Sequence, residues 1–223
     1  MSIQDMPYSF KLARTVGHGL LRRTFDVVLS IVSLIALAPV MLAIAVLIVI
    51  EDGGPVFFQQ TRLGFDGQPF GMYKFRKFRS DCGTSGAPLT VEGDSRMTRI
   101  GRFLAATKLD ELPQLWNILK GDMAVVGPRP ESLAFADCFQ NGYEEILQHR
   151  PGLVGPSQVA FRHEAKLYPA DEDPSIFYRR VLFPAKAVLD LAYFKRRTIG
   201  SDLGLMVQSA LTIFNIQPSL SKT

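Results

Sequence analysis

The most extended pattern in the sequence is an apolar run without any charge at residues 27–50. As a straight helix this run would measure roughly 36 Å, which is enough to cross a bilayer core of about 30 Å. Arg22 and Arg23 precede it, and Glu51 and Asp52 follow it. The run is too long for the apolar region of a signal peptide, and no cleavage site of small residues follows it. The pattern therefore predicts a membrane helix.

Two membrane arrangements fit this run. A single spanning helix is the simplest interpretation of the hydropathy, and the arginines before it would hold its N-terminus in the cytoplasm. However, Ala38 and Pro39 lie in the middle of the run. Because proline removes a backbone donor and clashes with the preceding turn, a kink or helix break there can fold the segment back to the face it entered, as a re-entrant hairpin. We accordingly divide the chain into residues 1–52, a basic and partly amphipathic lead-in with the membrane helix, and residues 53–223, one compact body.

The body begins with the alternation expected of a β-hairpin. Residues 55–58 form a short apolar strand, and the glycines that bound residues 64–71 predict a turn. In residues 72–76, aromatic side chains alternate with Lys74 and Arg76. One face of this strand is therefore apolar and the other cationic. The cations either form a solvated edge or bind phosphate.

Helical periodicity and capping signals predict the elements that follow a polar loop at residues 77–95. We expect helices at residues 96–104, 110–120, 131–148, 176–191 and 203–214, and a strand at residues 123–126. The last two helices are amphipathic and are joined by the basic residues 195–197. They lie either at a membrane interface, with the cations towards lipid phosphates, or in the core of the body.

Residues 107–130 combine a helix with candidate chemistry. Apolar residues recur at helical spacing, at Leu112, Leu115, Trp116 and Leu119. With Thr107 as the N-cap and Gly121 as the stop, Asp110 and Glu111 would lie in the first turn. There the helix dipole keeps a carboxylate ionised and available as a nucleophile or metal ligand, although acidic residues often only complement the dipole. Arg129 follows in a rigid turn and has the shape for bidentate contact with phosphate.

The composition narrows the class of protein only in part. The 223 residues are 47% apolar, and the mean hydropathy of +0.12 suits one membrane element on a globular body. A net charge of +4 suits anionic lipids, nucleotide phosphates or nucleic acid without choosing among them. Cys82 and Cys138 give neither a disulfide framework nor a metal-binding pair, which fits a reducing compartment.

Several motifs together resemble the bacterial sugar transferase family, the monotopic enzymes that move a sugar 1-phosphate from a nucleotide sugar to a polyprenyl phosphate. The resemblance covers most of residues 22–162. It rests on the motifs at residues 55–58, 60–64, 73–76, 109–114, 119–123, 126–130 and 150–152. It implies an α/β, mostly helical fold in which a small cytosolic catalytic domain carries a short hairpin and interfacial helices.

The resemblance also implies a mechanism and a site. An Asp at the position of Asp110 attacks the phosphate that bears the sugar, releases UMP and passes the phospho-sugar to undecaprenyl phosphate, while Glu111 assists as a metal or proton partner. Mg²⁺ would be held by Asp110 and Glu111. The phosphate-binding residues would be Lys74, Arg76, Pro128, Arg129 and Arg162. The expected partners are a UDP-sugar, undecaprenyl phosphate and membrane lipid, and a homodimer is compatible with the sequence.

The implied location is the cytoplasmic face of the bacterial inner membrane, which favours the re-entrant arrangement because nucleotide sugars are cytosolic. The chain departs from the family at two positions. Ala38 replaces a serine, and Ala105 stands where many relatives have arginine, so Lys108 or a nearby arginine would have to contact phosphate instead. A membrane-anchored lipid-binding or assembly protein would explain the hydropathy and charge, but not these motifs in this order. No nucleic-acid-binding motif is recognisable.

The re-entrant arrangement predicts that both ends of the chain lie on one side of the membrane. In a background carrying Cys82→Ser and Cys138→Ser, Asp5→Cys and Leu220→Cys should be equally shielded from an impermeant thiol reagent in intact cells. Pro39→Ala restores a good helix former and should shift the segment towards spanning. Labelling of one end alone in the parent protein would contradict the arrangement.

Overall fold

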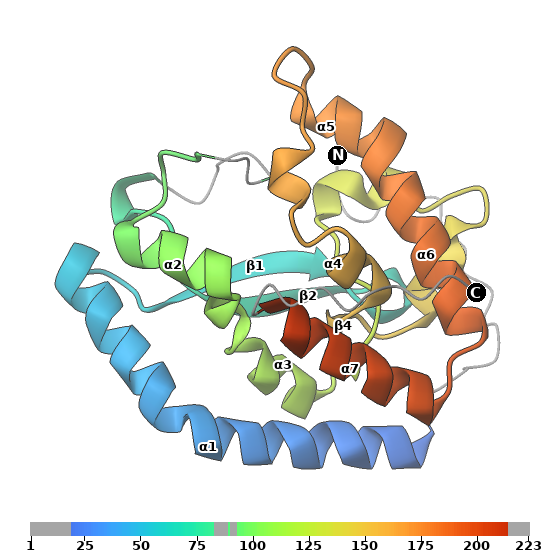
Figure 1. Ribbon diagram of the computed structural model, residues 1–223, viewed down its shortest axis with the longest axis horizontal. Helices are drawn as coiled ribbons and strands as arrows, with labels where there is room; N and C mark the ends of the chain where they lie inside the picture. The colour runs from blue at the N-terminus through green and yellow to red at the C-terminus, as the bar shows by residue number, and fades with distance from the viewer. Residues whose placement is uncertain (1–18, 83–88, 90–92, 214–223) are drawn as a thin grey trace.

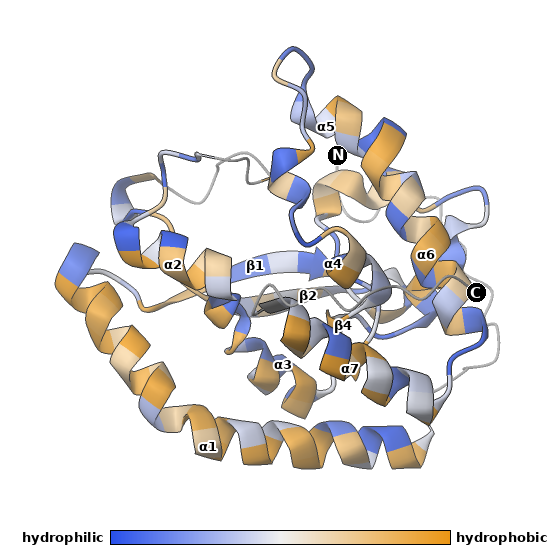
Figure 2. Ribbon diagram, in the orientation of Figure 1, coloured by the Kyte–Doolittle hydropathy of each residue, from blue (hydrophilic) through white to orange (hydrophobic). Residues whose placement is uncertain are grey.

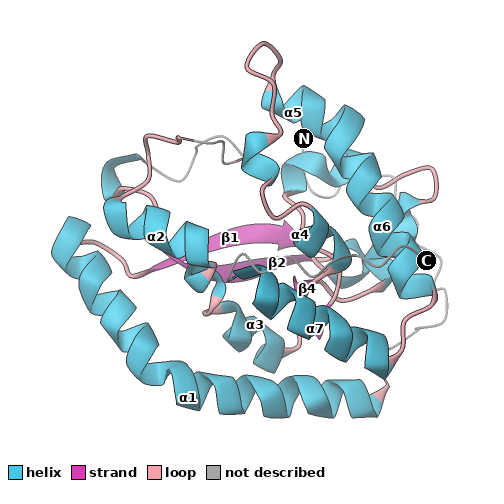
Figure 3. Ribbon diagram, viewed as in Figure 1, coloured by secondary structure: helices cyan, strands magenta, loops and turns pink. Residues whose placement is uncertain are grey.

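The computed structural model describes residues 19–82, 89 and 93–213 of the chain. Within these residues the protein is mostly helical, with small two-stranded sheets at its centre (Figure 3). The mostly helical fold with a short hairpin is therefore confirmed.

The helix α1, Leu20–Asp52, contains the whole apolar run. It continues through Pro39 as one helix, so a full break at Ala38 and Pro39 is wrong for this structure, whereas the alternative of a kink is compatible with it. Figure 1 shows instead a continuous helix with a bend, and proline inside a helix is the usual cause of a bend because it removes one hydrogen bond. By length and composition α1 could cross a membrane, and little of its apolar surface is buried in the body. Figure 2 shows apolar residues along most of its length.

Both ends of α1 bind the same body, which lies on the concave side of the bend (Figure 1). Near the N-terminal end, Arg23 donates to two backbone carbonyls at the end of α3, at 2.5 and 2.8 Å, and Asp26 accepts from the amide of Val125 at 3.1 Å. At the other end, Glu51 accepts from two amides at the start of α2, at 2.7 and 2.9 Å. Charged groups therefore fix each end of α1 to elements that come later in the chain.

The hairpin predicted from the alternation is present. Strands β1, Phe57–Leu63, and β2, Pro69–Phe75, pair antiparallel and place Phe58 opposite Lys74. The predicted strand at residues 123–126 is β3, Ala124–Val126, and it pairs in parallel with β4, Gly152–Val154, which the sequence did not indicate. A Cβ on Gly127 would lie 2.2 Å from the Arg150 carbonyl oxygen, so only glycine allows this approach.

Several predicted helices have different bounds. The segment predicted at residues 96–104 is α2, Arg99–Thr107, which is capped by Thr98. Thr107 therefore ends α2 and does not cap the next helix. That helix, α3, is Gln114–Lys120, and it starts after Pro113 because proline suits the start of a helix and Gly121 ends it in a left-handed conformation.

The segment at residues 131–148 is not one helix. It forms two 3₁₀ segments, Leu133–Cys138 and Tyr143–Gln148, because Asn141 and Gly142 between them have positive φ angles of 58° and 98°. Two consecutive residues in that conformation cannot continue a right-handed helix.

The C-terminal third of the described chain is helical, as expected, but more divided. It contains the short helices α4, Pro156–Ala160, and α5, Pro174–Phe177, a π-helical turn at Tyr178–Leu182, and the helices α6, Phe183–Lys195, and α7, Ile199–Ile213. Along α6, Phe183 and Ala187 pack in the same buried cluster as Phe135. Leu205 of α7 packs in another buried cluster, and both helices also leave apolar side chains exposed, Val188 on α6 and Leu203 and Val207 on α7.

Arg76 joins the hairpin to the end of α1. Its Nη1 lies 2.8 Å from Asp52 Oδ2, and it also donates to the Gly53 carbonyl; its side chain is 7% exposed and that of Asp52 is 22% exposed. We predict that Arg76→Ala lowers the free energy of unfolding by about 3 kcal/mol, because a mostly buried carboxylate then loses its partner. For a chain of this size the thermal midpoint in detergent should fall by roughly 10 °C.

The matched control is Arg79→Ala. Arg79 pairs with Asp81, but their side chains are 53% and 60% exposed, so the midpoint should not change measurably. Equal effects of the two substitutions would show that Arg76 does not hold α1 to the body.

Candidate active site

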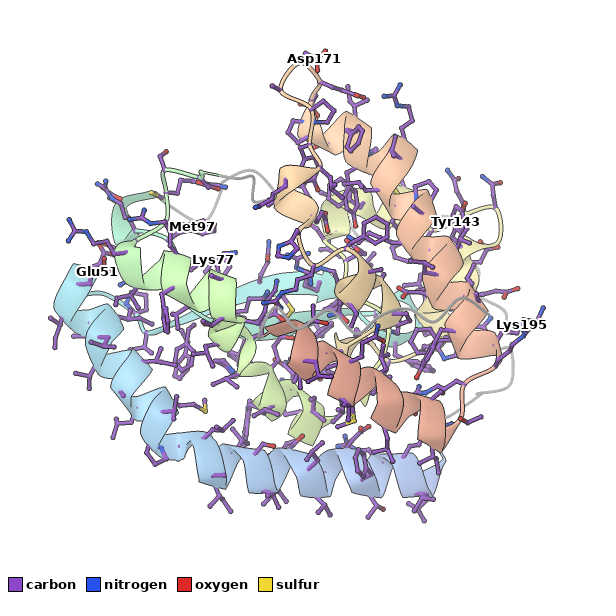
Figure 4. All side chains as sticks on the ribbon, in the orientation of Figure 1. Glu51, Lys77, Met97, Tyr143, Asp171 and Lys195 are labelled. Atoms are coloured by element: carbon purple, nitrogen blue, oxygen red, sulfur yellow. The ribbon has the colours of Figure 1, made fainter. Side chains whose placement is uncertain are left out.

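A cavity with a volume of about 890 Å³ lies in the described part of the chain. It lies among the hairpin, the turn that follows α2, the turn that contains Arg129, and residues 157–168. Figure 4 shows Lys77 and Met97, two residues of its lining, beside α2. Cations and carboxylates from distant parts of the sequence meet in this lining, so it is the strongest candidate for a functional site.

Asp110 lies in a 3₁₀ turn, Leu109–Glu111, between α2 and α3. Lys108 reverses the chain in the left-handed conformation, with φ of 62°, and Leu109 and Leu112 anchor the turn in a buried cluster with Phe75. The expected position in the first turn of an α-helix is therefore wrong. Asp110 is 3% exposed, and its Oδ1 has no hydrogen-bond partner among the described residues. A carboxylate that only capped a helix would accept from the backbone amides there.

Burial raises the pKa of Asp110 above its usual value, and the neighbouring charge of Glu111 adds to this, although Lys74 and Lys77 oppose it. The anion of Asp110 is consequently poorly solvated and more basic than a surface carboxylate. Asp110 does not itself line the cavity; it lies next to Glu111, which does.

Glu111 receives a direct cationic partner from the hairpin. Lys74 Nζ lies 2.8 Å from Glu111 Oε1, and the two side chains are 12% and 11% exposed. Burial alone would raise the pKa of Glu111, but Lys74, Lys108 and Arg129 together hold it well below its usual value. Glu111 is therefore ionised at neutral pH. Its ion pair with Lys74 offsets the repulsion between the adjacent carboxylates of Asp110 and Glu111.

The other cations of the lining crowd one another. Burial opposes the charge of Arg129, but Glu111, Glu164 and Glu131 raise its pKa, so it stays charged. Burial and the nearby Arg129 lower the pKa of Arg62 to about 10, and burial and Lys74 lower that of Lys77 to about 8. Since a bound anion would offset the repulsion between these cations, the lining favours a ligand with several negative charges.

The remaining predicted phosphate-binding residues lie in different places. Arg162 lines the cavity and donates to the Ala106 carbonyl at 3.2 Å. Arg76 also lines it, but its guanidinium is held by Asp52 and Gly53. Pro128 lies outside this cavity, and its carbonyl accepts from Gly152 at 2.8 Å. The structure thus gathers Lys74, Glu111, Arg129 and Arg162 around the cavity.

Several lining residues were not identified from the sequence. Arg62 lies within the motif at residues 60–64, but nothing in the sequence indicates that its side chain faces the cavity. Glu131, Glu164, Tyr168 and Lys186 come from three separate segments, and no local spacing relates them. Only the folded chain brings them together.

The carboxylates of the site determine whether a magnesium ion fits there. Within the described ranges, no group of three or more His, Cys, Asp or Glu side chains gathers to hold a metal. However, Mg²⁺ is normally bound by one or two carboxylates together with substrate phosphates and water. The unpartnered Oδ1 of Asp110 beside Glu111 fits that smaller donor set.

A cavity lined by cations and carboxylates, on a body that carries a long apolar helix with most of its apolar surface exposed, is typical of a protein that handles polyanions beside a membrane or another apolar phase. The family model described as bacterial sugar transferase matches residues 17–216. The chain therefore belongs to the bacterial sugar transferase family.

Its curated relatives have related names. It is 35% identical over 201 residues to the UDP-N-acetylgalactosamine-undecaprenyl-phosphate N-acetylgalactosaminephosphotransferase of Aeromonas hydrophila, covering 88% of this chain and 44% of that protein. It is 37% identical over 166 residues to a putative undecaprenyl-phosphate N-acetylgalactosaminyl 1-phosphate transferase of Bacillus subtilis, covering 74% of this chain and 90% of the relative. It is 34% identical over 203 residues to the UDP-glucose:undecaprenyl-phosphate glucose-1-phosphate transferase of Escherichia coli, covering 88% and 40%. The chain thus spans less than half of the first and third of these relatives.

The low pKa of Lys77 leads to a prediction about how ligand binding depends on pH. Since its pKa is about 8, Lys77 loses its charge as the pH rises through 8, and the affinity of the cavity for an anionic ligand should fall there. With a nucleotide sugar as the ligand, binding or kcat/KM should decrease about tenfold between pH 7.5 and 9.5.

Lys77→Arg is the matched variant, because arginine keeps its charge over this range and should move the alkaline limb upwards. If the parent protein and Lys77→Arg have the same profile, Lys77 does not contact the anion.

Proposed function

We propose that this protein transfers a sugar 1-phosphate from a UDP-sugar to undecaprenyl phosphate, as a first membrane step in the assembly of a bacterial polysaccharide or glycan. The observation that carries the proposal is the pair of adjacent buried carboxylates, Asp110 and Glu111, beside Lys74 at a cation-lined cavity. The names of its relatives supply the donor and acceptor classes.

In the first half-reaction, a carboxylate oxygen of Asp110 attacks the β-phosphorus of the donor. The new O–P bond forms as the bond from phosphorus to the bridging oxygen breaks, and UMP leaves with the bonding electron pair. In the second half-reaction, a phosphate oxygen of undecaprenyl phosphate attacks the same phosphorus and displaces the Asp110 carboxylate. Two displacements of this kind predict ping-pong kinetics.

The cations of the lining offset the charge of the diphosphate. Arg129 is suited to bidentate contact with phosphate oxygens, and the charges of Glu111, Glu164 and Glu131 keep its guanidinium charged for this contact. Lys77, Lys108 and Arg162 supply point charges around it, and Lys108 takes the place of the arginine that Ala105 replaces. Lys74 remains with Glu111 and keeps that carboxylate ionised and oriented.

A magnesium ion held by Asp110, Glu111 and the donor phosphates would neutralise charge on the diphosphate and make UMP a better leaving group. Asp110 lies behind the lining, so its carboxylate must turn towards the cavity for attack. Its Oδ1 gives up no hydrogen bond to a described residue in doing so.

The membrane arrangement that we propose is re-entrant, with the body on the cytoplasmic face of the inner membrane. Its support is that Arg23 and Asp26 at one end of α1, and Glu51 at the other, bind the same body. A helix that spanned the bilayer would place these ends on opposite sides. The bend at Pro39 allows both contacts, and the exposed apolar side chains of α1 then face lipid.

We predict that Asp110→Asn abolishes UMP release from the donor, because an amide is a far poorer nucleophile in nearly the same volume. Incubation of the parent protein with donor alone should add one sugar-phosphate mass to a peptide that contains Asp110. Glu111→Gln should reduce the rate by 10²-fold or more and still allow a trace of adduct.

Asp171→Asn is the control, since Asp171 is exposed at the tip of a loop that projects from the body (Figure 4), and it should keep parental activity. Fragmentation that places the adduct on Glu111, or normal turnover by Asp110→Asn, would refute the assignment of the nucleophile.

A further inference from the structure

A second group of charged side chains lines the same cavity and has no part in the reaction described above. Lys186 Nζ, from α6, lies 2.8 Å from Glu164 Oε2, 3.2 Å from the Tyr178 hydroxyl and 3.8 Å from Glu131 Oε1. The Tyr168 hydroxyl donates to Glu164 Oε1 at 2.7 Å. We call these residues, Glu131, Glu164, Tyr168, Tyr178 and Lys186, the carboxylate cluster.

The carboxylate cluster differs in charge from the rest of the lining. Burial raises the pKa of Glu164, but Lys186 and Arg129 lower it further, so Glu164 is an anion at neutral pH. Each carboxylate oxygen has two lone pairs, and Glu164 uses one on each oxygen for Lys186 and Tyr168. It can therefore accept further hydrogen bonds from a ligand in the cavity.

Arg129 is the cation that this cluster shares with the Asp110 and Glu111 turn. The charges of Glu111, Glu164 and Glu131 all act on its guanidinium. A phosphate would be attracted to the cationic part of the lining and repelled by Glu131 and Glu164. The part of a ligand that fits beside these carboxylates is neutral and rich in hydroxyl donors.

The geometry points to the carboxylate cluster as the subsite for the sugar of the donor, with Glu164 accepting hydrogen bonds from neighbouring hydroxyl groups. This inference rests on the proposed function. The donor carries such hydroxyls on its sugar and on its ribose, and only the sugar is attached to the phosphorus that Asp110 attacks. The cluster and Glu111 act on the same cation, Arg129, so the cluster lies near the reacting phosphorus, and the diol nearer to that phosphorus is that of the sugar.

Stability of the fold alone does not explain the carboxylate cluster. Lys186 is 4% exposed and Glu131 is 9% exposed, and buried ion pairs seldom stabilise a fold more than apolar side chains of the same volume would. Recognition of hydroxyl groups, by contrast, gains from buried acceptors, since a sugar that lacks the matching hydroxyl leaves an acceptor unsatisfied. The cluster is therefore suited to discriminate between epimers.

The experiment measures kcat/KM for UMP release from UDP-glucose, UDP-galactose and their N-acetylated counterparts, with the parent protein and Glu164→Gln. We expect Glu164→Gln to lower kcat/KM for the preferred donor about tenfold or more, and to reduce the preference between epimers by a similar factor. Inhibition by UMP, which contains the ribose and no hexose, should be unchanged.

Two further variants separate recognition from folding. Tyr168→Phe keeps the ring and removes only the hydroxyl that orients Glu164, and it should shift the epimer preference in the same direction by a smaller factor. Glu145→Gln, an exposed carboxylate outside the cavity, should match the parent protein in preference and in thermal midpoint.

The outcomes are distinct. If the parent protein releases UMP but Glu164→Gln and Tyr168→Phe keep its epimer preference, the subsite is refuted while the proposed function stands. Weaker inhibition by UMP with an unchanged epimer preference would assign the cluster to the ribose and also overturn the inference. Absence of UMP release from every donor by the parent protein would instead refute the proposed function.

Discussion

The ion pair between Lys74 and Glu111 is the interaction on which the site depends. Two adjacent carboxylates in a largely buried turn repel one another, and each loses hydration that water would otherwise provide. Lys74 offsets both costs for Glu111, which leaves Asp110 as the desolvated and more basic member of the pair. The pKa of Glu111 is thus lowered and that of Asp110 raised because the lysine of the hairpin pairs with Glu111.

The hairpin can supply this lysine because it is held at both ends. Its register places Lys74 opposite Phe58, and Arg76 at its end is tied to Asp52 of α1. On the other side, Asn117 of α3 accepts from the Tyr73 amide and donates to the Gly71 carbonyl. The same short strand therefore connects the apolar helix, the turn that contains Asp110 and Glu111, and α3. The ion pair between Arg76 and Asp52 and the hydrogen bonds of Asn117 thus set the position of the cavity relative to α1.

The sequence allowed the local elements to be predicted better than the contacts between them. The alternation around Lys74 identified the hairpin, and a strand before Arg129 is present as β3. Thr107 was interpreted as an N-cap because nothing local reveals that Lys108 takes a left-handed conformation, which is uncommon for lysine.

The site was predictable to the extent that its residues lie in contiguous motifs, as Asp110 and Glu111 do. The carboxylate cluster was not, because the carboxylate partners of Lys186, Glu164 and Glu131, lie 22 and 55 residues away in the chain. The strand β4 was missed for the same reason, since its pairing with β3 is a non-local contact.

The contacts at the ends of α1 also constrain how the protein is made. Asp26 is synthesised long before Val125, and Glu51 before the start of α2, so an emerging α1 has no partner for its charged ends. During that interval the apolar segment can meet the bilayer without any contact that distinguishes a crossing helix from one that returns. In the re-entrant arrangement proposed above, the orientation of α1 would consequently be decided when the body folds and binds both ends of the helix. The body would then act as the topogenic signal for the helix that precedes it.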